Sequence, residues 1–205
     1  MFLPVIRRGT LLKAGLVTTL SLAARLFAIG SKSLWLDEAF ALEAARLPVD
    51  RILGLPSAAI PHAPFHFLLV KASMGVFGSS EAALRLPSAL LSGLAVLPLM
   101  LLVARLAGRR AGLWAGLFWS LATYAVSLGQ EAWVYGTLAG LGLLFAALSL
   151  EVWRGGRRLL PPMLAVAAAG IWTSLLFGLF ALAGLGLWAT VDGRRRVRST
   201  SVRGR

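Results

Sequence analysis

The sequence predicts an all-α, polytopic integral membrane protein, and three observations lead to this prediction. Of the 205 residues, 58% are hydrophobic and only 14% are charged, whereas soluble domains carry roughly 45–50% apolar and about 25% charged residues. The mean hydropathy of +0.80 excludes a disordered chain, because so much apolar surface would not stay solvated. The apolar residues also form runs as long as a membrane helix. We therefore expect about six transmembrane helices, with about five as the alternative, plus interfacial helices in the first external loop.

The charged residues indicate which side of the membrane each connecting segment occupies. The formal net charge is +13, from 21 Lys and Arg against 8 Asp and Glu. In an integral membrane protein such an excess marks cytoplasmic loops, so we expect membrane lipids and no nucleic acid as partners. The chain has no cysteine, which excludes a disulfide framework, a zinc–thiolate site and a thiol nucleophile.

Four apolar runs have the length of a single membrane helix. They cover Leu11–Ile29, Leu86–Val103, Ala111–Leu128 and Val134–Val152. Arg7 and Arg8 precede the first run, which places the N-terminus in the cytoplasm. The arginines at 105–110 and 154–158 then also fall inside if each run crosses once. An uncleaved anchor is favoured over a signal peptide, because Arg25 interrupts the first run and no clear cleavage site follows it.

The last apolar run, Leu159–Val191, is too long for one span. A single helix would place the arginines at 194–198 outside, against the positive-inside rule. A break near Trp172–Gly178 would instead make a hairpin of two short helices and return the tail to the cytoplasm, and we prefer this hairpin. Residues 1–192 are then one transmembrane module, and residues 193–205 form a basic cytoplasmic tail.

The long external loop, at about residues 31–85, is where ionisable side chains concentrate. We expect a short helix over Asp37–Arg46, since acidic residues suit the first turn of a helix. The stretch Pro61–Gly78 is largely apolar yet carries His66 and Lys71. An interfacial amphipathic helix fits it better than a further span.

Asp37 and Glu38 are the first candidates for chemistry. Paired carboxylates at a membrane face can act as a general base or bind a divalent metal ion. The alternative is structural, with Asp37 capping the helix and Glu38 interacting with its dipole. His62 and His66 are spaced i and i+4 and share one helix face. A metal site formed by His62 with Asp37 is therefore a second hypothesis, against simple hydrogen bonding by the histidines.

Further polar candidates lie near the starts of two predicted helices. Arg85 would bind the phosphate of a lipid-linked substrate through its guanidinium, or else contact lipid headgroups or pair with Glu81. Glu131 and Tyr135 lie one turn apart before the fourth helix, and an acid at a membrane boundary is a functional candidate. The alternative for Glu131 is a solvated turn. The glycines of residues 138–142 predict close helix packing.

Five short motifs follow one another in an order that resembles a known family. They are WLDE after the first span, PHAPFH, FGSSEAALRLPS, GRRAGL and GQEAWVY. Together they resemble the N-terminal membrane module of GT-C glycosyltransferases, specifically the bacterial relatives of dolichyl-phosphate-mannose protein mannosyltransferases. Transferases that add aminoarabinose or galacturonic acid to lipid A belong to the same group. The resemblance spans about residues 10–190. Because such relatives continue with further spans, we expect the basic tail to be a truncation point.

The resemblance implies an enzyme that moves a sugar from a polyprenyl-phosphate carrier to an acceptor at the outer face of the bacterial inner membrane. The acceptor would be a lipid, a polysaccharide or a protein. Asp37 would be the catalytic base or acceptor-orienting carboxylate, with Glu38 beside it. A divalent metal ion, held by Asp37 and His62, is the one cofactor considered. The implied substrate-binding residues are Arg85, Glu131, Tyr135 and Lys71.

A non-catalytic or truncated protein of the same scaffold is the alternative function. It would bind a lipid phosphate or a partner subunit, with binding dependent on Arg85 and without sugar transfer. A small transporter is disfavoured, because the charged residues gather outside the spans and only Arg25 lies well inside one.

Overall fold

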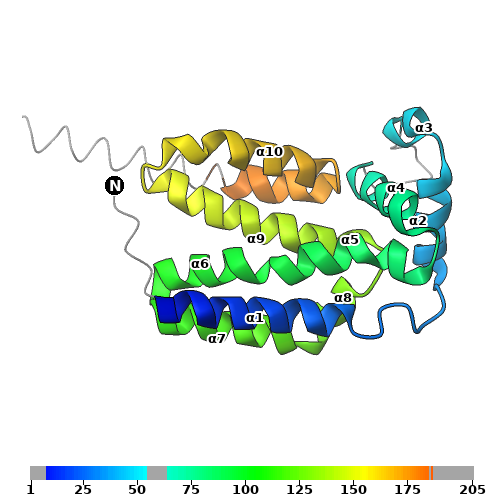
Figure 1. Cartoon of the computed structure of the whole chain (residues 1–205). Helices are drawn as coiled ribbons and strands as arrows, with labels where there is room; N and C mark the ends of the chain where they lie inside the picture. Colours follow the sequence, from blue (N-terminus) through cyan, green and yellow to red (C-terminus); the bar gives the residue numbers. More distant parts are fainter. Residues whose placement is uncertain (1–7, 55–63, 185, 187–205) are drawn as a thin grey trace, which may run out of the picture.

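The structure is a computed structural model that describes residues 8–54, 64–184 and 186, and every regular element in these segments is a helix. The prediction of an all-α protein is therefore confirmed for the described residues. Figure 1 labels the helices. They are α1 (Arg8–Leu26), α2 (Leu36–Arg46), α3 (Val49–Leu53), α4 (Phe65–Phe77), α5 (Glu81–Leu94), α6 (Val96–Ala107), α7 (Arg109–Leu121), α8 (Thr123–Gly129), α9 (Val134–Trp153), the 3-10 turn η1 (Arg157–Leu159) and α10 (Leu160–Ile171), followed by a helical segment over Leu175–Gly184.

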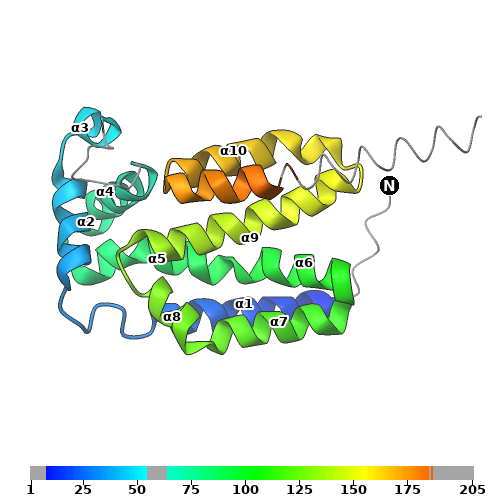
Figure 2. The same cartoon turned by 180° about the vertical axis from the view of Figure 1, so that it is seen from behind.

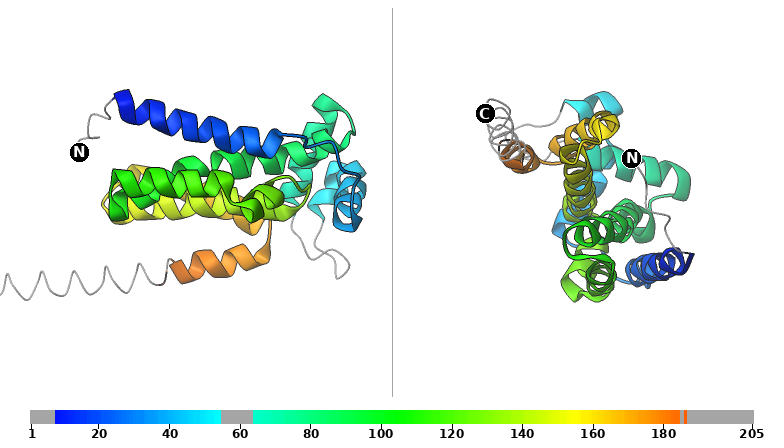
Figure 3. Two further views of the ribbon diagram at one scale, coloured as in Figure 1. Left: turned by 90° about the horizontal axis from the view of Figure 1, so that it is seen from below. Right: turned by 90° about the vertical axis from the view of Figure 1, so that its left-hand side faces the viewer.

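The longer helices run side by side, and the short helices cap one end of them. Seen along their axes, α10, α9, α6 and α7 form a column, with α1 at its side (Figure 3). Helices α2, α3 and α4 gather at the end where α1 finishes and α5 and α9 begin (Figures 1 and 2). The opposite end holds the α6–α7 turn and the end of α9. The two ends of the bundle thus differ in structure, with short helices at one end and turns between long helices at the other.

Length and hydropathy alone identify two helical stretches among the described residues that could cross a membrane. They are Glu81–Ala107, with 27 residues, and Val134–Trp153, with 20 residues. The bent pair α7 and α8 would be a third if it acts as one span. Helix α1 carries Lys13 and Arg25 and is not among them, and the two arms of the C-terminal hairpin are short. The count of about six spans therefore stays a prediction.

The single helix predicted over Ala111–Leu128 is wrong, because the chain bends by 62° between α7 and α8. Ala122 lies at the break with extended backbone angles, φ −63° and ψ 113°. A break of this kind leaves a carbonyl of the preceding turn without its helical N–H partner. The carbonyl oxygen of Trp119 instead accepts a hydrogen bond of 3.3 Å from Arg25 Nη2.

Arg25 is fully buried and joins four helices. Its Nε donates to the hydroxyl of Ser92 on α5 at 2.8 Å, and its Nη1 donates to the hydroxyl and carbonyl of Ser21 on α1 at 3.0 and 3.1 Å. Its Nη2 also lies 3.4 Å from the carbonyl of Ala125 on α8. The guanidinium lies 5.5 Å from the ring centroid of Trp119 on α7, where the ring face attracts a cation. Hydroxyls, carbonyls and an aromatic ring thus make burial of this charge tolerable.

The helix predicted from Leu86 begins earlier, at Glu81, so the external loop ends sooner than expected. Ser80 is the reason, because its hydroxyl accepts a hydrogen bond of 3.3 Å from the N–H of Ala83 and so caps the helix. Arg85 therefore projects from a regular helix rather than from a loop. The helix expected over Pro61–Gly78 is observed as α4, and its first expected residues lie outside the described part of the chain.

The predicted C-terminal hairpin is confirmed as far as the structure describes it. Helix α10 ends at Ile171, and a second helical arm over Leu175–Gly184 follows a short turn and runs back beside it (Figures 1 and 3). Phe177 holds the two arms together, because its ring packs against Gly170 and against Phe145 on α9. The carbonyl of Trp172 in the turn accepts a hydrogen bond of 2.8 Å from the N–H of Phe65.

Candidate active site

A cavity of about 600 Å³ lies at the capped end of the bundle, where the segment after α1 meets α2, α5 and the α8–α9 turn. Its walls come from four separate parts of the chain. The lining residues are Phe27, Ala28, Ile29, Ser31, Lys32, Ser33, Trp35, Glu38, Arg85, Ser127, Gln130 and Glu131. Three of the predicted site residues (Glu38, Arg85 and Glu131) therefore line one cavity, although they are far apart in the sequence.

The floor of the site is a buried ion pair between Glu38 and Arg85. Glu38 Oε1 accepts from Arg85 Nε at 2.7 Å, and Glu38 Oε2 accepts from Arg85 Nη2 at 2.6 Å. The carboxylate is only 1% exposed, so this two-pronged contact replaces the water that it loses. Glu38 Oε1 also accepts the N–H of Ala132 at 2.8 Å. The pair thus ties α2, α5 and the turn before α9 to one another.

Arg85 uses all of its N–H groups within the protein. Besides the two contacts to Glu38, Nη1 donates to the carbonyls of Ile29 and Lys32 at 2.8 and 2.9 Å, and Nη2 donates to that of Ser33 at 3.2 Å. A guanidinium has five N–H groups, and this set occupies them. Arg85 therefore holds the segment after α1 in place. A direct contact to a phosphate would require one of these bonds to be given up, and that role stays a prediction.

Glu38 and Glu131 have opposite electrostatic environments. Burial by itself raises the pKa of Glu38, but the hydrogen bonds from Arg85 and Ala132 outweigh it, so this pKa lies below its usual range. The pKa of Glu131 is raised, mainly by burial and then by repulsion from Glu38 and Asp37, with Arg85 partly offsetting it. Glu131 is therefore the stronger base of the two, and Glu38 is held as a fixed anion.

Asp37 lies beside this cavity rather than in its wall. It is half-buried in the first turn of α2 and close enough to Glu131 to disfavour a second negative charge there. The suggestion that Asp37 caps α2 is wrong, because the N-cap position is Trp35. The backbone N–H of Trp35 faces Glu38 Oε2 at 3.4 Å.

The α8–α9 turn is attached to the end of α1 by Gln130. Its Nε2 donates to the carbonyls of Ala24 and Phe27 at 3.1 and 3.0 Å. The carbonyl of Ala24 belongs to the last turn of α1, and that of Phe27 follows directly after the helix, where helical N–H donors run out. Ala28 follows with a φ of +51°, a left-handed conformation that turns the chain toward the cavity. The hydrogen bonds of Gln130 thus hold the neighbouring Glu131 close to the segment after α1, which also carries Lys32.

The remaining predicted site residues lie elsewhere. Tyr135 is 46% exposed at the start of α9 and is not among the residues that line the cavity. Lys71 donates from Nζ to the carbonyls of Ala45 and Leu47 at 3.2 and 2.8 Å, so it caps the end of α2. His62 falls outside the described residues. His66 is buried in α4, with its Nδ1 2.9 Å from the hydroxyl of Thr137 on α9.

The described residues do not by themselves form a metal site. No group of three His, Asp or Glu side chains with ligand geometry occurs among them. Glu38 is committed to Arg85, which leaves Asp37 and Glu131 as neighbouring carboxylates. A divalent ion usually needs more oxygen or nitrogen ligands than these two side chains supply. A metal ion held by Asp37 and His62 stays a prediction.

Lys32 is a functional candidate that the sequence did not point out. It is exposed and lines the cavity, where it and Arg85 are the cationic residues among the described lining residues. Its carbonyl accepts a hydrogen bond from Arg85, so the segment that carries its ammonium group is fixed. The signal available in the sequence was only its position, just after the first helix and before the WLDE motif.

Comparison with known proteins gives one match. The family model described as dolichyl-phosphate-mannose-protein mannosyltransferase matches residues 61–202, which is more than half of the chain. Arg85 and Glu131 lie within the matched region, and Asp37 and Glu38 precede it. No curated protein and no solved structure matches the chain.

Proposed function

Because the chain belongs to the dolichyl-phosphate-mannose-protein mannosyltransferase family, whose members are membrane glycosyltransferases of the GT-C type, we propose that its cavity takes part in sugar transfer at the outer face of the membrane. The family uses sugar donors linked to a polyprenyl phosphate. The proposed reaction moves the sugar from that carrier to a hydroxyl of a lipid, polysaccharide or protein acceptor.

The observation that carries this proposal is the meeting of acidic and basic side chains in one cavity at the end of the apolar bundle. Glu131 and Lys32 line the cavity, and Asp37 lies within electrostatic reach of Glu131. A carrier lipid stays in the membrane, so its phosphate can reach only a site near the membrane boundary. The position of the cavity at one end of the apolar helices supports a site of this kind.

Asp37 and Lys32 take part directly in the proposed transfer. The acceptor oxygen attacks the anomeric carbon of the sugar, and the bond from that carbon to the phosphate oxygen breaks. Asp37, next to Glu131, takes the proton of the acceptor hydroxyl. The polyprenyl phosphate leaves with the bonding electron pair, and Lys32 stabilises its negative charge. Glu38 and Arg85 position the segments that carry these groups.

The test is a transfer assay in membranes that contain the chain, with polyprenyl-phosphate mannose as the first donor probe. A general base contributes typically 10²–10⁴-fold, so Asp37→Asn should reduce transfer at least about a hundredfold. Asp50→Asn is the matched control, because Asp50 is exposed on α3 and outside the cavity lining. Both variants should insert into membranes equally. Unchanged turnover in Asp37→Asn would refute the role of this carboxylate.

The alternative, a scaffold that binds a lipid phosphate without transferring sugar, makes a different prediction. Binding would depend on Arg85, and no donor in a panel of polyprenyl-phosphate sugars would lose its sugar. The geometry favours the enzyme, because the N–H groups of Arg85 are already engaged by Glu38 and by backbone carbonyls.

A further inference from the structure

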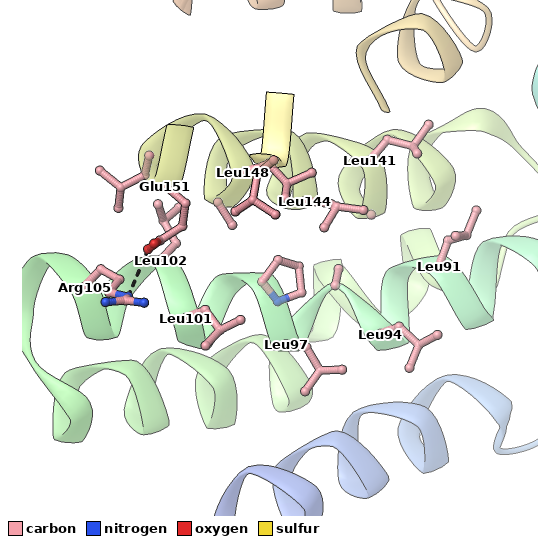
Figure 4. Close-up of a pocket in the computed structure, with 16 residues that line it drawn as sticks. Leu91, Leu94, Leu97, Leu101, Leu102, Arg105, Leu141, Leu144, Leu148 and Glu151 are labelled. Atoms are coloured by element: carbon pink, nitrogen blue, oxygen red, sulfur yellow. Dashed lines mark ion pairs between the residues drawn. The ribbon is translucent and has the colours of Figure 1, made fainter. Parts of the chain in front are cut away.

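A second cavity lies far from the candidate active site (the acidic cavity, lined by Glu38 and Glu131). It occupies the groove between α5–α6 and α9. Its volume is about 560 Å³. Figure 4 shows the leucine side chains of the two facing helices that line it. Leu97 and Leu101 on α6 and Leu144 on α9 are exposed, so the groove opens to the surface of the bundle.

The charged residues of this groove lie at one end only. Of the 16 lining residues, Arg105 and Glu151 are the charged ones, and their side chains pair at 3.0 Å (Figure 4). Arg154 lies next to them, because its Nη2 donates to the carbonyl of Arg105 at 3.0 Å. The two arginines exceed the single glutamate by one positive charge. Arg157 and Arg158 follow in η1 and are exposed at the same end.

The groove is longer than one leaflet of a bilayer is thick. Its lining runs from Leu91 to Arg105 along α5 and α6, which is about 21 Å at about 1.5 Å per helical residue. One leaflet contributes about 15 Å to a hydrocarbon core of about 30 Å. An acyl chain entering from the arginines would therefore reach past the middle of the membrane.

We propose that this groove binds an anionic phospholipid, with the phosphate at Arg105 and Arg154 and one acyl chain among the leucines. The excess positive charge at the arginine end of the groove complements a phosphodiester anion. The apolar walls of the groove suit the acyl chain of the lipid. Arg105 lies in the last turn of α6, and this end of α6 lies at the opposite end of the bundle from α2, which carries Glu38 (Figure 1). The lipid in this groove is therefore separate from the sugar carrier and lies in the opposite leaflet from the site of sugar transfer. The proposal does not depend on the proposed sugar transfer.

Native mass spectrometry of the purified chain in detergent tests this proposal, with phosphatidylglycerol as the probe. The expected result is a phosphatidylglycerol adduct on the monomer that forms in preference to adducts of phosphatidylethanolamine or phosphatidylcholine. A basic residue near an anionic lipid contributes about 1 kcal/mol, or about fivefold in affinity. Arg105→Gln should therefore weaken phosphatidylglycerol binding about fivefold.

Two further variants make the result specific to the groove. Arg109→Gln removes an equal charge from an exposed position at the same end but outside the groove lining, and it should change binding less than about twofold. Ala147→Phe leaves the arginines in place and fills the groove, so it should abolish the adduct.

Three outcomes would overturn the proposal. The first is equal weakening by Arg105→Gln and Arg109→Gln, which would indicate only a diffuse attraction to the basic end. The second is unchanged binding in Ala147→Phe, which would mean that no acyl chain enters the groove. The third is a lipid-free dimer that dissociates in Ala147→Phe, which would identify a second copy of the chain as the occupant.

Discussion

The carboxylate of Glu38 is almost completely removed from water and is paired with one cation. Breaking a buried ion pair by changing one partner typically costs about 3–5 kcal/mol, since the other charge is left uncompensated. Glu38→Gln should therefore lower the free energy of unfolding by about this amount, because Arg85 would stay buried without a counterion. Thermal unfolding in detergent is the measurement.

Glu43 provides the matched control on the same helix. It pairs with Arg46 at 2.7 Å, but both side chains are more than half exposed. Exposed pairs contribute at most about 1 kcal/mol, so Glu43→Gln should change the unfolding temperature little. If the two variants unfolded at the same temperature, the pair of Glu38 and Arg85 would not be the fixed floor of the site.

Glu131 makes the stability of the protein depend on pH. Its pKa is raised in the folded protein by burial and by neighbouring carboxylates, so the folded state penalises its ionised form. This penalty is absent below the unfolded-state pKa of about 4.3 and grows as the pH rises through the folded-state pKa. Glu131→Gln should therefore unfold at a higher temperature than the parent at neutral pH, with no difference in acid.

Thermal unfolding scanned from acidic to neutral pH measures this difference. Gln is isosteric with Glu, so the comparison isolates the charge. A constant gap across the pH range would mean that Glu131 is not perturbed. The same substitution should impair sugar transfer in the assay described above, because Glu131 lines the cavity and lies within electrostatic reach of Asp37.

At the scale of single elements, the sequence was informative where a local signal decides the structure. Acidic residues predicted the start of the helix observed as α2, and the length of the last apolar run predicted a hairpin break, observed between Ile171 and Leu175. The prediction of close packing at residues 138–142 is confirmed at Gly140. A Cβ added there would lie 2.8 Å from the carbonyl of Leu91 on α5.

The bend between α7 and α8 had no local signal. The residues around Ala122 include neither proline nor glycine, which are the usual causes of a sharp kink. A contact from a distant part of the chain accompanies the bend, because Arg25, 94 residues before Trp119, donates to the Trp119 carbonyl next to the break. A long-range hydrogen bond of this kind cannot be inferred from the periodicity of one segment.

The pairing of α6 with α7 leads to a prediction about Gly112. A Cβ on this residue would lie 2.5 Å from the carbonyl oxygen of Met100 and 2.9 Å from the Cβ of Ala104. Gly112 and Gly116 form a GxxxG pattern, which lets membrane helices approach closely. Gly112→Ala should therefore push the two helices apart and destabilise the protein by about 1–3 kcal/mol, the usual cost of overpacking. Thermal unfolding in detergent measures this cost.

Gly15 on α1 is the control for this substitution. Nothing lies within 4 Å of a Cβ added there. Alanine is favoured over glycine in a helix by about 0.5–1 kcal/mol, so Gly15→Ala should be neutral or stabilising. Equal effects of the two substitutions would mean that helix propensity, and not the contact with Met100, determines the result.

At the scale of the whole molecule, the candidate site illustrates the limit of motif-based inference. The sequence identified Glu38, Arg85 and Glu131 as polar candidates, and the fold brings them to one cavity. The sequence could not assign the roles of these residues. Those roles depend on which backbone carbonyls accept hydrogen bonds from Arg85, and only the fold determines this. The sequence analysis missed Lys32 for a related reason. Its position at the cavity follows from the hydrogen bonds that Arg85 donates to the backbone of residues 29–33.

The two ends of the bundle differ in charge, and this difference predicts the orientation of the protein in the membrane. Arginines at positions 105, 109, 110, 154, 157 and 158 lie at or next to the end of α6, the start of α7, the end of α9 and η1. Figure 1 shows this end of the bundle opposite to α2, which carries Glu38. Basic segments are retained in the cytoplasm, so the acidic cavity should face outward. Because the chain contains no cysteine, a single introduced thiol reports its own position without background.

Two single-cysteine variants at exposed positions test this orientation. Ser33→Cys lies in the segment that lines the acidic cavity, and Ala107→Cys lies at the end of α6 beside the arginines. In intact cells, a membrane-impermeant maleimide should label Ser33→Cys and leave Ala107→Cys unlabelled. After permeabilisation it should label both, which shows that both thiols are reactive. Labelling of Ala107→Cys but not of Ser33→Cys in intact cells would mean that the cavity faces the cytoplasm. That result would exclude sugar transfer at the outer face, whatever the activity of the carboxylate variants.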